Sequence, residues 1–416
     1  MCGIAGIITI KNSKIDSTVV ENVKRSLEHR GPDHSSHQFI KESVCLIHTR
    51  LSIIDLNDRS NQPFQSNDER YTIVFNGEIY NYKELRKELE TKGHKFITNG
   101  DTEVLLQGYI EYEEKILNKL RGQFAFVIYD KITNELFMAR DRIGIKPLYY
   151  SVNDNWILFG SEIKAIELSK LIEFEPDIDS YLAYLRHLCV PADSTGNKNI
   201  KKLEPGQFIR IDKNGKISKK IYWDPFTFSV NHDLNEKNVV EELDRLLNES
   251  VEYRKVSDVE VGLFLSGGLD SSLLGKLMKK NSDSSLKAFN VDFEENFEGY
   301  KGELKEARFA SSEIGINLNE EKINFDNFKE IFDNYAYYQD DLVGDEVGIP
   351  LYFLGKSSRT SGIKVVLVGE GSDELFYGYD HWNRLLKLSK YKKPYSSTNN
   401  KFSKLSNHRL NLLSNM

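Results

Sequence analysis

The pattern of predicted strands and helices changes partway along this 416-residue chain. In the first 205 residues, β-branched and aromatic runs predict five strands, at 44–54, 71–79, 123–130, 135–141 and 156–162. Turn residues follow several of these runs closely, which favours antiparallel pairing. Two helices are predicted between them, at 82–92 and at 102–112, with Asp101 as the N-cap of the second. Strands with segregated helices indicate a layered α+β domain.

The second half of the chain alternates strand and helix. Buried strands are predicted at 259–266, 286–293 and 364–371, and helices at 238–253, 272–280, 304–315 and 350–358. Such alternation is typical of a parallel sheet covered by helices. We expect four segments: a first domain over 1–215, a linker over 216–236, a second domain over 237–386 and a basic, solvated tail over 387–416.

Composition excludes several classes of protein. The net charge is -7, from 63 acidic and 56 basic residues, whereas nucleic-acid-binding proteins usually carry a basic excess. No apolar run is long enough to span a membrane, and no basic segment precedes the N-terminal apolar residues as in a secretory signal. The three cysteines are widely spaced, which argues against a disulfide framework or a structural zinc site. We therefore expect a reduced, cytoplasmic protein.

Cys2 is the first candidate for chemistry. Removal of Met1 would place a thiol and a free α-amine on one residue, and an α-amine is partly unprotonated at neutral pH. The amine can then take the thiol proton and activate the nucleophile. The alternative is that Cys2 is only a small residue at the start of a buried strand.

Six short motifs follow Cys2 or include it: MCGIAGI, HRGPD at 29–33, RLSIID at 50–55, NGEIYN at 76–81, NGDTE at 99–103 and RDRIGIKPLYY at 140–150. In this order they resemble the class II glutamine amidotransferase domain, an N-terminal-nucleophile fold with two sheets between helices (αββα). The resemblance covers about residues 2–215. It implies that Cys2 attacks the side-chain amide of glutamine and releases ammonia.

The same resemblance implies roles for the residues around Cys2. Asn76 and Gly77 would form the oxyanion hole, and Asp101 would hold the glutamine ammonium. Arg50 would hold the carboxylate with its fork of donors. The residues expected to bind glutamine are Arg50, Leu51, Ser52, Ile53, Ile54, Asn76, Gly77, Glu78 and Asp101. From the residues alone, Asn76-Gly77 suits a turn after a strand, Arg50 equally suits a structural salt bridge, and Asp101 a helix cap.

A second candidate site is the glycine-rich segment 259–278. A predicted strand runs into Ser266-Gly267-Gly268, and a helix begins near Asp270, so backbone N–H groups can cradle an anion. The Walker A pattern is absent, and an ordinary glycine-rich turn remains the alternative. The whole motif SGGLDSS resembles the pyrophosphate loop of ATP-pyrophosphatases. That resemblance implies ATP contacts from Leu265, Ser266, Gly267, Gly268, Asp270, Ser271, Ser272 and Val291.

GEGSDELFYGY at 369–379 extends the second resemblance. It implies that Val368 and Gly369 contact the nucleotide, and that Glu370 assists at the acyl-adenylate. Asp373 would share Mg²⁺ with Asp270, since hard cations prefer oxygen ligands. A solvated acidic loop is the alternative.

An amidotransferase domain followed by this second domain resembles the glutamine-dependent asparagine synthetase family. The resemblance implies that ATP converts an acceptor carboxylate, aspartate in the type enzyme, to an acyl-AMP that ammonia then attacks. We expect residues 339–350 to help form the acceptor pocket. Another carboxylate, such as a sugar uronic acid, is the alternative acceptor. Val368 departs from the family pattern, which has a serine there.

Members of the family usually continue beyond the point that corresponds to Met416. The sequence therefore also predicts an incomplete synthetase domain, and a truncated chain that retains only glutaminase activity is a further alternative. A separate chain supplying the missing part, or a homodimer, is the expected kind of protein partner. The small-molecule partners would be glutamine, ATP and the acceptor, with no nucleic acid and no membrane.

Overall fold

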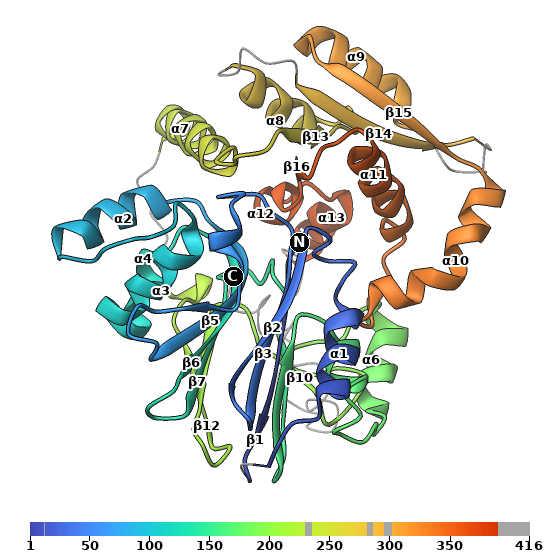
Figure 1. The fold of residues 1–416 in the computed structure, drawn as a ribbon. Helices are drawn as coiled ribbons and strands as arrows, with labels where there is room; N and C mark the ends of the chain where they lie inside the picture. Colours follow the sequence, from blue (N-terminus) through green and yellow to red (C-terminus); the bar gives the residue numbers. More distant parts are fainter. Residues whose placement is uncertain (12, 229–234, 281–285, 295–301, 390–416) are drawn as a thin grey trace. The chain divides into compact units, whose positions relative to one another are not determined.

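The computed structural model describes residues 1–11, 13–228, 235–280, 286–294 and 302–389. By its internal contacts the chain divides into two compact units, residues 1–368 and residues 369–416. The first unit holds two antiparallel sheets and one parallel sheet, which Figure 1 shows with their helices.

Two six-stranded antiparallel sheets form the amino-terminal part. The first has the order β10-β8-β9-β1-β3-β2 and consists of β1 (Gly3–Thr9), β2 (His34–Lys41), β3 (Val44–Arg50), β8 (Tyr149–Val152), β9 (Trp156–Gly160) and β10 (Lys201–Lys202). The second has the order β12-β11-β7-β6-β5-β4 and consists of β4 (Phe64–Gln65), β5 (Tyr71–Ile79), β6 (Gly122–Asp130), β7 (Glu135–Arg140), β11 (Gln207–Ile211) and β12 (Ile217–Ile221). β12 pairs with β11, so the second sheet extends past residue 215.

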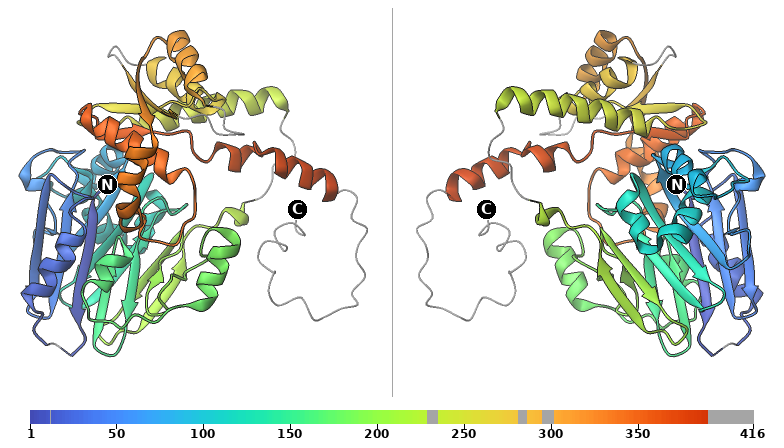
Figure 2. Two further views of the ribbon diagram at one scale, coloured as in Figure 1. Left: turned by 90° about the vertical axis from the view of Figure 1, so that its right-hand side faces the viewer. Right: turned by 90° about the vertical axis from the view of Figure 1, so that its left-hand side faces the viewer.

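The two sheets pack face to face, with helices on both outer sides. Ile4 and Leu46 of the first sheet share one buried cluster with Val74 and Val127 of the second. Helices α1 (Ser17–Ser26) and α5 (Ile163–Glu167) cover the first sheet, and α2 (Tyr82–Thr91), α3 (Asp101–Tyr112) and α4 (Ile116–Lys119) cover the second. The resulting αββα layers can be followed from two sides in Figure 2. Side chains alternate between the two faces of a strand, and the central strands β1, β3 and β6 are buried on both faces.

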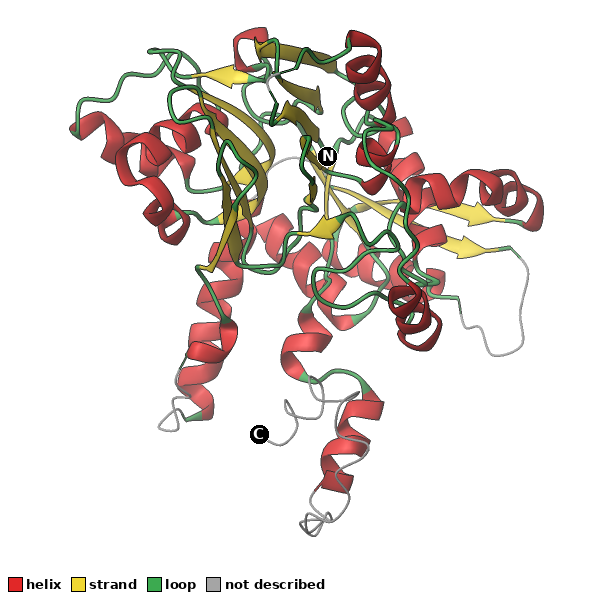
Figure 3. Cartoon of the chain, turned by 90° about the horizontal axis from the view of Figure 1, so that it is seen from below, coloured by secondary structure: helices red, strands yellow, loops and turns green. Residues whose placement is uncertain are grey.

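A four-stranded parallel sheet follows, with the order β15-β14-β13-β16. Its strands are β13 (Val261–Phe264), β14 (Lys287–Phe293), β15 (Asn317–Ile323) and β16 (Val365–Leu367). The helices of this region are α7 (Glu236–Arg254), α8 (Leu269–Lys280), α9 (Leu304–Ile314), α10 (Phe325–Gln339) and α11 (Gly348–Thr360). Apolar residues of α8 and α9 pack with β13 and β14 in one buried cluster, and Figure 3 distinguishes the helices from the strands by colour.

The second unit contains two described helices, α12 (Ser372–Phe376) and α13 (Asp380–Ser389). Gly371, with a φ of +95°, caps α12 in the left-handed region that favours glycine. Most of the tail that we predict over 387–416 lies outside the described residues.

The fold class predicted from the sequence is confirmed: an αββα domain precedes an α/β domain with a parallel sheet. Some boundaries are wrong. β3 ends at Arg50 rather than at residue 54, and α3 begins at Asp101 itself, with Gly100 as its cap. Helices α6 (Ile178–His187) and α10 and strand β15 are not predicted from the sequence. In the part of the chain that the structure describes, no helix is both long and apolar enough to cross a bilayer.

Packing between the two antiparallel sheets should dominate the stability of the amino-terminal part. Leu46 is fully buried in that layer, so Leu46→Ala should lower the free energy of unfolding by about 2–5 kcal/mol. Leu185, which is 74% exposed, provides the matched control. Leu185→Ala should change the free energy of unfolding by less than about 0.5 kcal/mol. Denaturant unfolding followed by tryptophan fluorescence would measure both, and equal midpoints for the two variants would contradict this account of the core.

Candidate functional site

Cys2 lies directly before β1, which is in the interior of the first sheet between β9 and β3. The amide N–H of Leu51 donates to Cys2 Sγ at 3.4 Å. The carbonyl of Cys2 accepts from Arg30 Nε at 2.9 Å. Arg30 in turn donates to Glu162 at 2.8 Å. The antiparallel pairing of β1 with β3 therefore places the thiol against the segment that follows β3.

Burial sets the protonation of the groups at this end of β1. Desolvation raises the pKa of the Cys2 thiol, although the neighbouring α-amine and the hydrogen bond with Leu51 oppose the rise. Desolvation also lowers the pKa of the α-amine, which here belongs to Met1, to about 5. Removal of Met1 would instead place the α-amine on Cys2 itself, where an unprotonated amine can act as the base for the thiol.

Cys2 opens onto a cavity of about 30 Å³. The residues around it come from the start of β1, the segment after β3, the end of β5 and the start of α3. They are Cys2, Arg50, Leu51, Ile53, Ile54, Ser60, Gln62, Phe75, Gly77, Glu78, Gly100, Asp101 and Thr102. The structure thus gathers most of the residues predicted to bind glutamine around one space. That space has room for about one water molecule.

Arg50, at the end of β3, is buried and is surrounded by backbone carbonyls. Its Nη2 donates to the carbonyls of Ile54 and Asp55, at 3.3 and 2.5 Å, and its Nη1 donates to Asn57 O and Asn61 Oδ1. No carboxylate is hydrogen-bonded to the guanidinium among the described residues, so the structural salt bridge considered from the sequence is not formed. The charge of Arg50 is instead available to an anion in the cavity.

Asp101 and Glu78 place two carboxyl groups beside this cavity. Asp101 Oδ2 accepts from the Ile79 amide at 2.9 Å, which links the first turn of α3 to β5, while Gly100 is the N-cap of α3. Burial raises the pKa of Asp101 to about 6, against the effect of its hydrogen bonds. Burial and the charge of Asp101 raise the pKa of Glu78 well above its ordinary value. Two carboxyl groups in this state favour the arrival of a cation.

Asn76 and Gly77 lie inside β5, not in the turn that we predict from the sequence. The oxygen and nitrogen of the Asn76 side chain are both buried without a hydrogen-bond partner in the described residues. An unpaired buried amide is costly unless a ligand completes it. At Gly77 a Cβ would lie 2.2 Å from Gln123 O, so the close pairing with β6 requires glycine.

The segment Ser266–Ser272 joins β13 to α8, as predicted. Gly267 has a φ of +86°, and a Cβ there would lie 2.3 Å from the backbone of Glu306 in α9. The hydroxyls of Ser266 and Ser271 lie 3.0 Å apart, and the Gly268 amide donates to Ser266 Oγ at 3.2 Å. Asp270 lies in the first turn of α8, where the helix dipole favours negative charge. A glycine at positive φ followed by the start of a helix is a feature shared with anion-binding loops.

The other predicted nucleotide contacts lie near the carboxyl edge of the parallel sheet. Val291 is near the end of β14, and Val368 follows β16 and is 41% exposed. Leu265 has its side chain in the core, so a contact would come from its carbonyl oxygen, which already accepts from Asn290 at 2.9 Å. In the second unit, Gly369 and Glu370 precede α12, and Asp373 lies in its first turn.

Two acidic residues of the predicted acceptor segment, 339–350, have other partners. Asp340 accepts hydrogen bonds from the backbone amides of Ile163 and Lys164. Asp341 accepts from the Tyr149 hydroxyl at 2.9 Å and pairs with Lys202 at 2.5 Å. These carboxylates therefore fix the segment to the amino-terminal part, and the contribution of residues 339–350 to an acceptor pocket stays a prediction.

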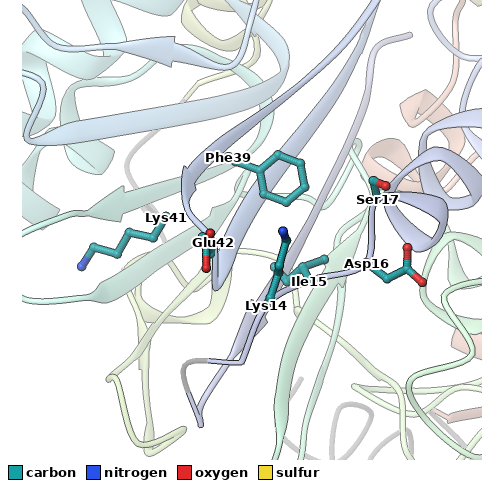
Figure 4. Close-up of a pocket in the computed structure, with 7 residues that line it drawn as sticks. All are labelled: Lys14, Ile15, Asp16, Ser17, Phe39, Lys41 and Glu42. Atoms are coloured by element: carbon teal, nitrogen blue, oxygen red, sulfur yellow. The ribbon is translucent and has the colours of Figure 1, made fainter.

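A larger hollow of about 760 Å³ lies beside the edge strand β2 (Figure 4). It is lined by Lys14, Ile15, Asp16, Ser17, Phe39, Lys41 and Glu42. None of these is a predicted site residue, and three of the seven, Lys14, Asp16 and Glu42, are exposed charged side chains. Among the described residues, no cluster of histidine, cysteine and acidic side chains suits a metal ion.

Several residues of the site were not singled out from the sequence. Asp55 accepts from the amides of Asn99 and Asn57 and from Ser60 Oγ, which joins the segment after β3 to the one before α3. Lys146 is buried, and its pKa is lowered by desolvation while Glu78 opposes the change. The motifs RLSIID and RDRIGIKPLYY contain these two residues, but nothing in their spacing indicates such contacts.

Comparison with known proteins gives two family matches. The model described as glutamine amidotransferase domain matches residues 1–223, and the model described as asparagine synthase matches residues 242–416. Asparagine synthetase [glutamine-hydrolyzing] 1 of Bacillus subtilis is 37% identical over 396 residues, 94% of this chain and 61% of that protein. Asparagine synthetase [glutamine-hydrolyzing] 3 of the same organism is 36% identical over 306 residues, 71% of this chain and 49% of that protein.

A third relative carries a different name. Amidase chry2 of Gibberella zeae is 33% identical over 410 residues, which cover 91% of this chain and 60% of that protein. This chain spans about three fifths of the length of the first-named relative. On the two consecutive family matches and the identity to the Bacillus proteins, the chain belongs to the glutamine-dependent asparagine synthetase family.

Proposed function

We propose that this protein is an ATP-dependent glutamine amidotransferase. It hydrolyses glutamine at Cys2 and passes the ammonia to an acceptor carboxylate that ATP has converted to an acyl-AMP. The observation that carries this proposal is the convergence of Cys2, Arg50 and Asp101 on one cavity. The anion cradle at Ser266–Ser272 supports the second half of the reaction.

In the first half-reaction the α-amine takes the proton of the Cys2 thiol, and the thiolate attacks the side-chain carbonyl of glutamine. Negative charge then develops on the carbonyl oxygen. The unpaired amide nitrogen of Asn76 and the backbone N–H of Gly77 would stabilise it. Collapse of this intermediate releases ammonia and leaves a glutamyl thioester, which water hydrolyses.

Glutamine would bind through its two charged ends. Its ammonium fits beside Asp101 and Glu78, where it would compensate two carboxyl groups that burial makes unfavourable to ionise. Its carboxylate fits the charge of Arg50, whose terminal nitrogens already donate to carbonyls of residues 54–61. The segment 51–54 would contribute the wall of the pocket between these two groups.

In the second half-reaction ATP would bind at the loop between β13 and α8. Ser266, Gly267, Gly268, Ser271 and Ser272 would hold its phosphates, and Asp270 would hold Mg²⁺ through its carboxylate oxygens. When bound, the ion neutralises phosphate charge. A carboxylate is a poor electrophile, so its conversion to an acyl-AMP supplies a good leaving group. Ammonia then displaces AMP.

Aspartate is the acceptor that we propose, on the names of the Bacillus relatives. The name of the Gibberella relative favours a second candidate, the same chemistry on another carboxylic acid. Product analysis with glutamine, ATP and a panel of acids, including aspartate and a uronic acid, distinguishes the two. Pyrophosphate release with none of them would leave glutamine hydrolysis as the activity of this chain.

The two half-reactions should separate by mutation. Cys2→Ala should lower glutamine-dependent product formation by at least about 1,000-fold, since the nucleophile is lost, and should leave ammonia-dependent product formation within about twofold. Amide product assayed with glutamine or with ammonium chloride measures both. Equal losses with the two nitrogen sources would contradict separate sites.

Asp270→Asn should have the opposite effect. Loss of a carboxylate in the first turn of α8 should lower pyrophosphate release by at least about 100-fold, and glutamine hydrolysis should keep its rate. Release of pyrophosphate and of glutamate, measured in the same samples, provides the comparison. If glutamate release fell in parallel with pyrophosphate, the assignment of Asp270 to the nucleotide would be wrong.

The raised pKa of Asp101, about 6, predicts how glutamine use depends on pH. Below pH 6 Asp101 is protonated and loses the charge that holds the ammonium, so kcat/KM for glutamine hydrolysis should fall about tenfold per pH unit. Above pH 6 the value should level off. In the Asp101→Asn variant kcat/KM for glutamine hydrolysis should be low at every pH and should not fall further below pH 6. A wild-type pH profile that is flat between pH 5 and 7 would refute the role of Asp101.

A further inference from the structure

The segment after β3 is held from the parallel-sheet part of the same unit. Asp258, three residues before β13, makes two hydrogen bonds to it. Its backbone amide donates to Ile53 O at 3.0 Å, and its carboxylate Oδ2 accepts from the Asp55 amide at 2.7 Å. Residues Leu51–Asp55, which we call the glutamine loop, thus contact both parts of the first unit.

The backbone of the glutamine loop is strained where Asp258 binds it. Asp55 has a φ of +46°, in the left-handed region that non-glycine residues rarely adopt. Such a conformation persists only where the surroundings fix it. Here Asp258 holds the amide of Asp55, Arg50 Nη2 holds its carbonyl at 2.5 Å, and Ser60 and Asn99 hold its carboxylate, each at 2.7 Å.

Residues held by these contacts line the cavity beside Cys2. The carbonyls of Ile54 and Asp55 fix the position of the Arg50 guanidinium, and Ile53 and Ile54 line the space that glutamine would occupy. A shift of the Asp55 turn would therefore move both the cation and one wall of the pocket. Asp258 itself does not line the cavity.

A second contact acts on the same loop. Asp33 Oδ2 accepts from the Ser52 amide and from Lys364 Nζ, each at 2.7 Å. Lys364 directly precedes β16, the neighbour of β13 in the parallel sheet. The starts of two adjacent strands, at the edge opposite the anion cradle, therefore both hold the glutamine loop.

We propose that Asp258 is a positioning residue for glutamine, supplied by the synthetase part of the chain. It holds the strained turn at Asp55, which in turn holds Arg50 for the substrate carboxylate. The inference rests on the proposed function of Cys2 and Arg50. It implies that the amidotransferase part binds glutamine fully only while the synthetase part is docked on it.

Steady-state glutamine hydrolysis by the full chain tests the proposal. Asp258→Ala removes the acceptor of one hydrogen bond, and it should raise KM for glutamine about three- to tenfold while kcat stays within twofold. Asp258→Asn keeps an oxygen acceptor in the same place and should restore KM to within about twofold. Asp244→Ala is the matched control, because Asp244 is an exposed aspartate on α7 whose side chain makes no contact with the glutamine loop.

The outcomes separate this proposal from the one on which it rests. If the parent chain does not hydrolyse glutamine, the proposed function fails first. If the parent is active and Asp258→Ala has the KM of Asp244→Ala, the positioning role is wrong. A fall in kcat and in melting temperature that Asp258→Asn does not rescue would also overturn it, since that result indicates a purely structural residue.

Discussion

The structure depends on how buried charge is balanced at one end of the two-sheet core. Arg50, Asp101 and Lys146 are nearly inaccessible to solvent, and Glu78 lies among them. A buried charge is costly unless another group compensates it. The carbonyls of the loop after β3 surround Arg50, and Lys146 opposes the charge of Glu78. The carboxyl groups of Asp101 and Glu78 keep raised pKa values, because no neighbouring cation fully compensates their charge. The ammonium of a zwitterionic substrate would supply that charge and gain affinity from it.

The fold could be predicted to a large extent, because its signals are local. Strand runs such as 71–79 and the alternation after residue 258 follow directly from residue type and periodicity. The misplaced end of β3 has a physical reason. Residues 51–54 are largely apolar, as in a strand, but their carbonyls have partners outside the sheet: Ile53 O accepts from the Asp258 amide and Ile54 O from Arg50. The chain therefore leaves the sheet after Arg50. Strand β15, with charged residues at 320–322, gives only a weak apolar signal, and its pairing with β14 determines it.

The sequence predicts most residues of the candidate site, but it does not predict several of the contacts that hold them. Cys2, Arg50, Gly77 and Asp101 meet around one cavity as the motifs indicate. The turn expected at Asn76 is wrong, because β5 continues to Ile79 and only a glycine at position 77 fits against the carbonyl of Gln123. Asp258 is more than 200 residues from its partner Asp55 in the sequence, so no local pattern reveals their hydrogen bond. Contacts of this kind depend on how separately folded layers dock.

The central claim is that the thiol at the start of β1 is the group that attacks glutamine. A diazoketone analogue of glutamine alkylates such a thiolate, and peptide mass spectrometry of the treated full chain locates the adduct. The account predicts a single adduct on Cys2, formed only on molecules that have lost Met1 and suppressed by excess glutamine, with the buried Cys45 and the half-buried Cys189 unmodified. Full glutamine hydrolysis by a chain that retains Met1, or an adduct on another cysteine that glutamine suppresses, would contradict it.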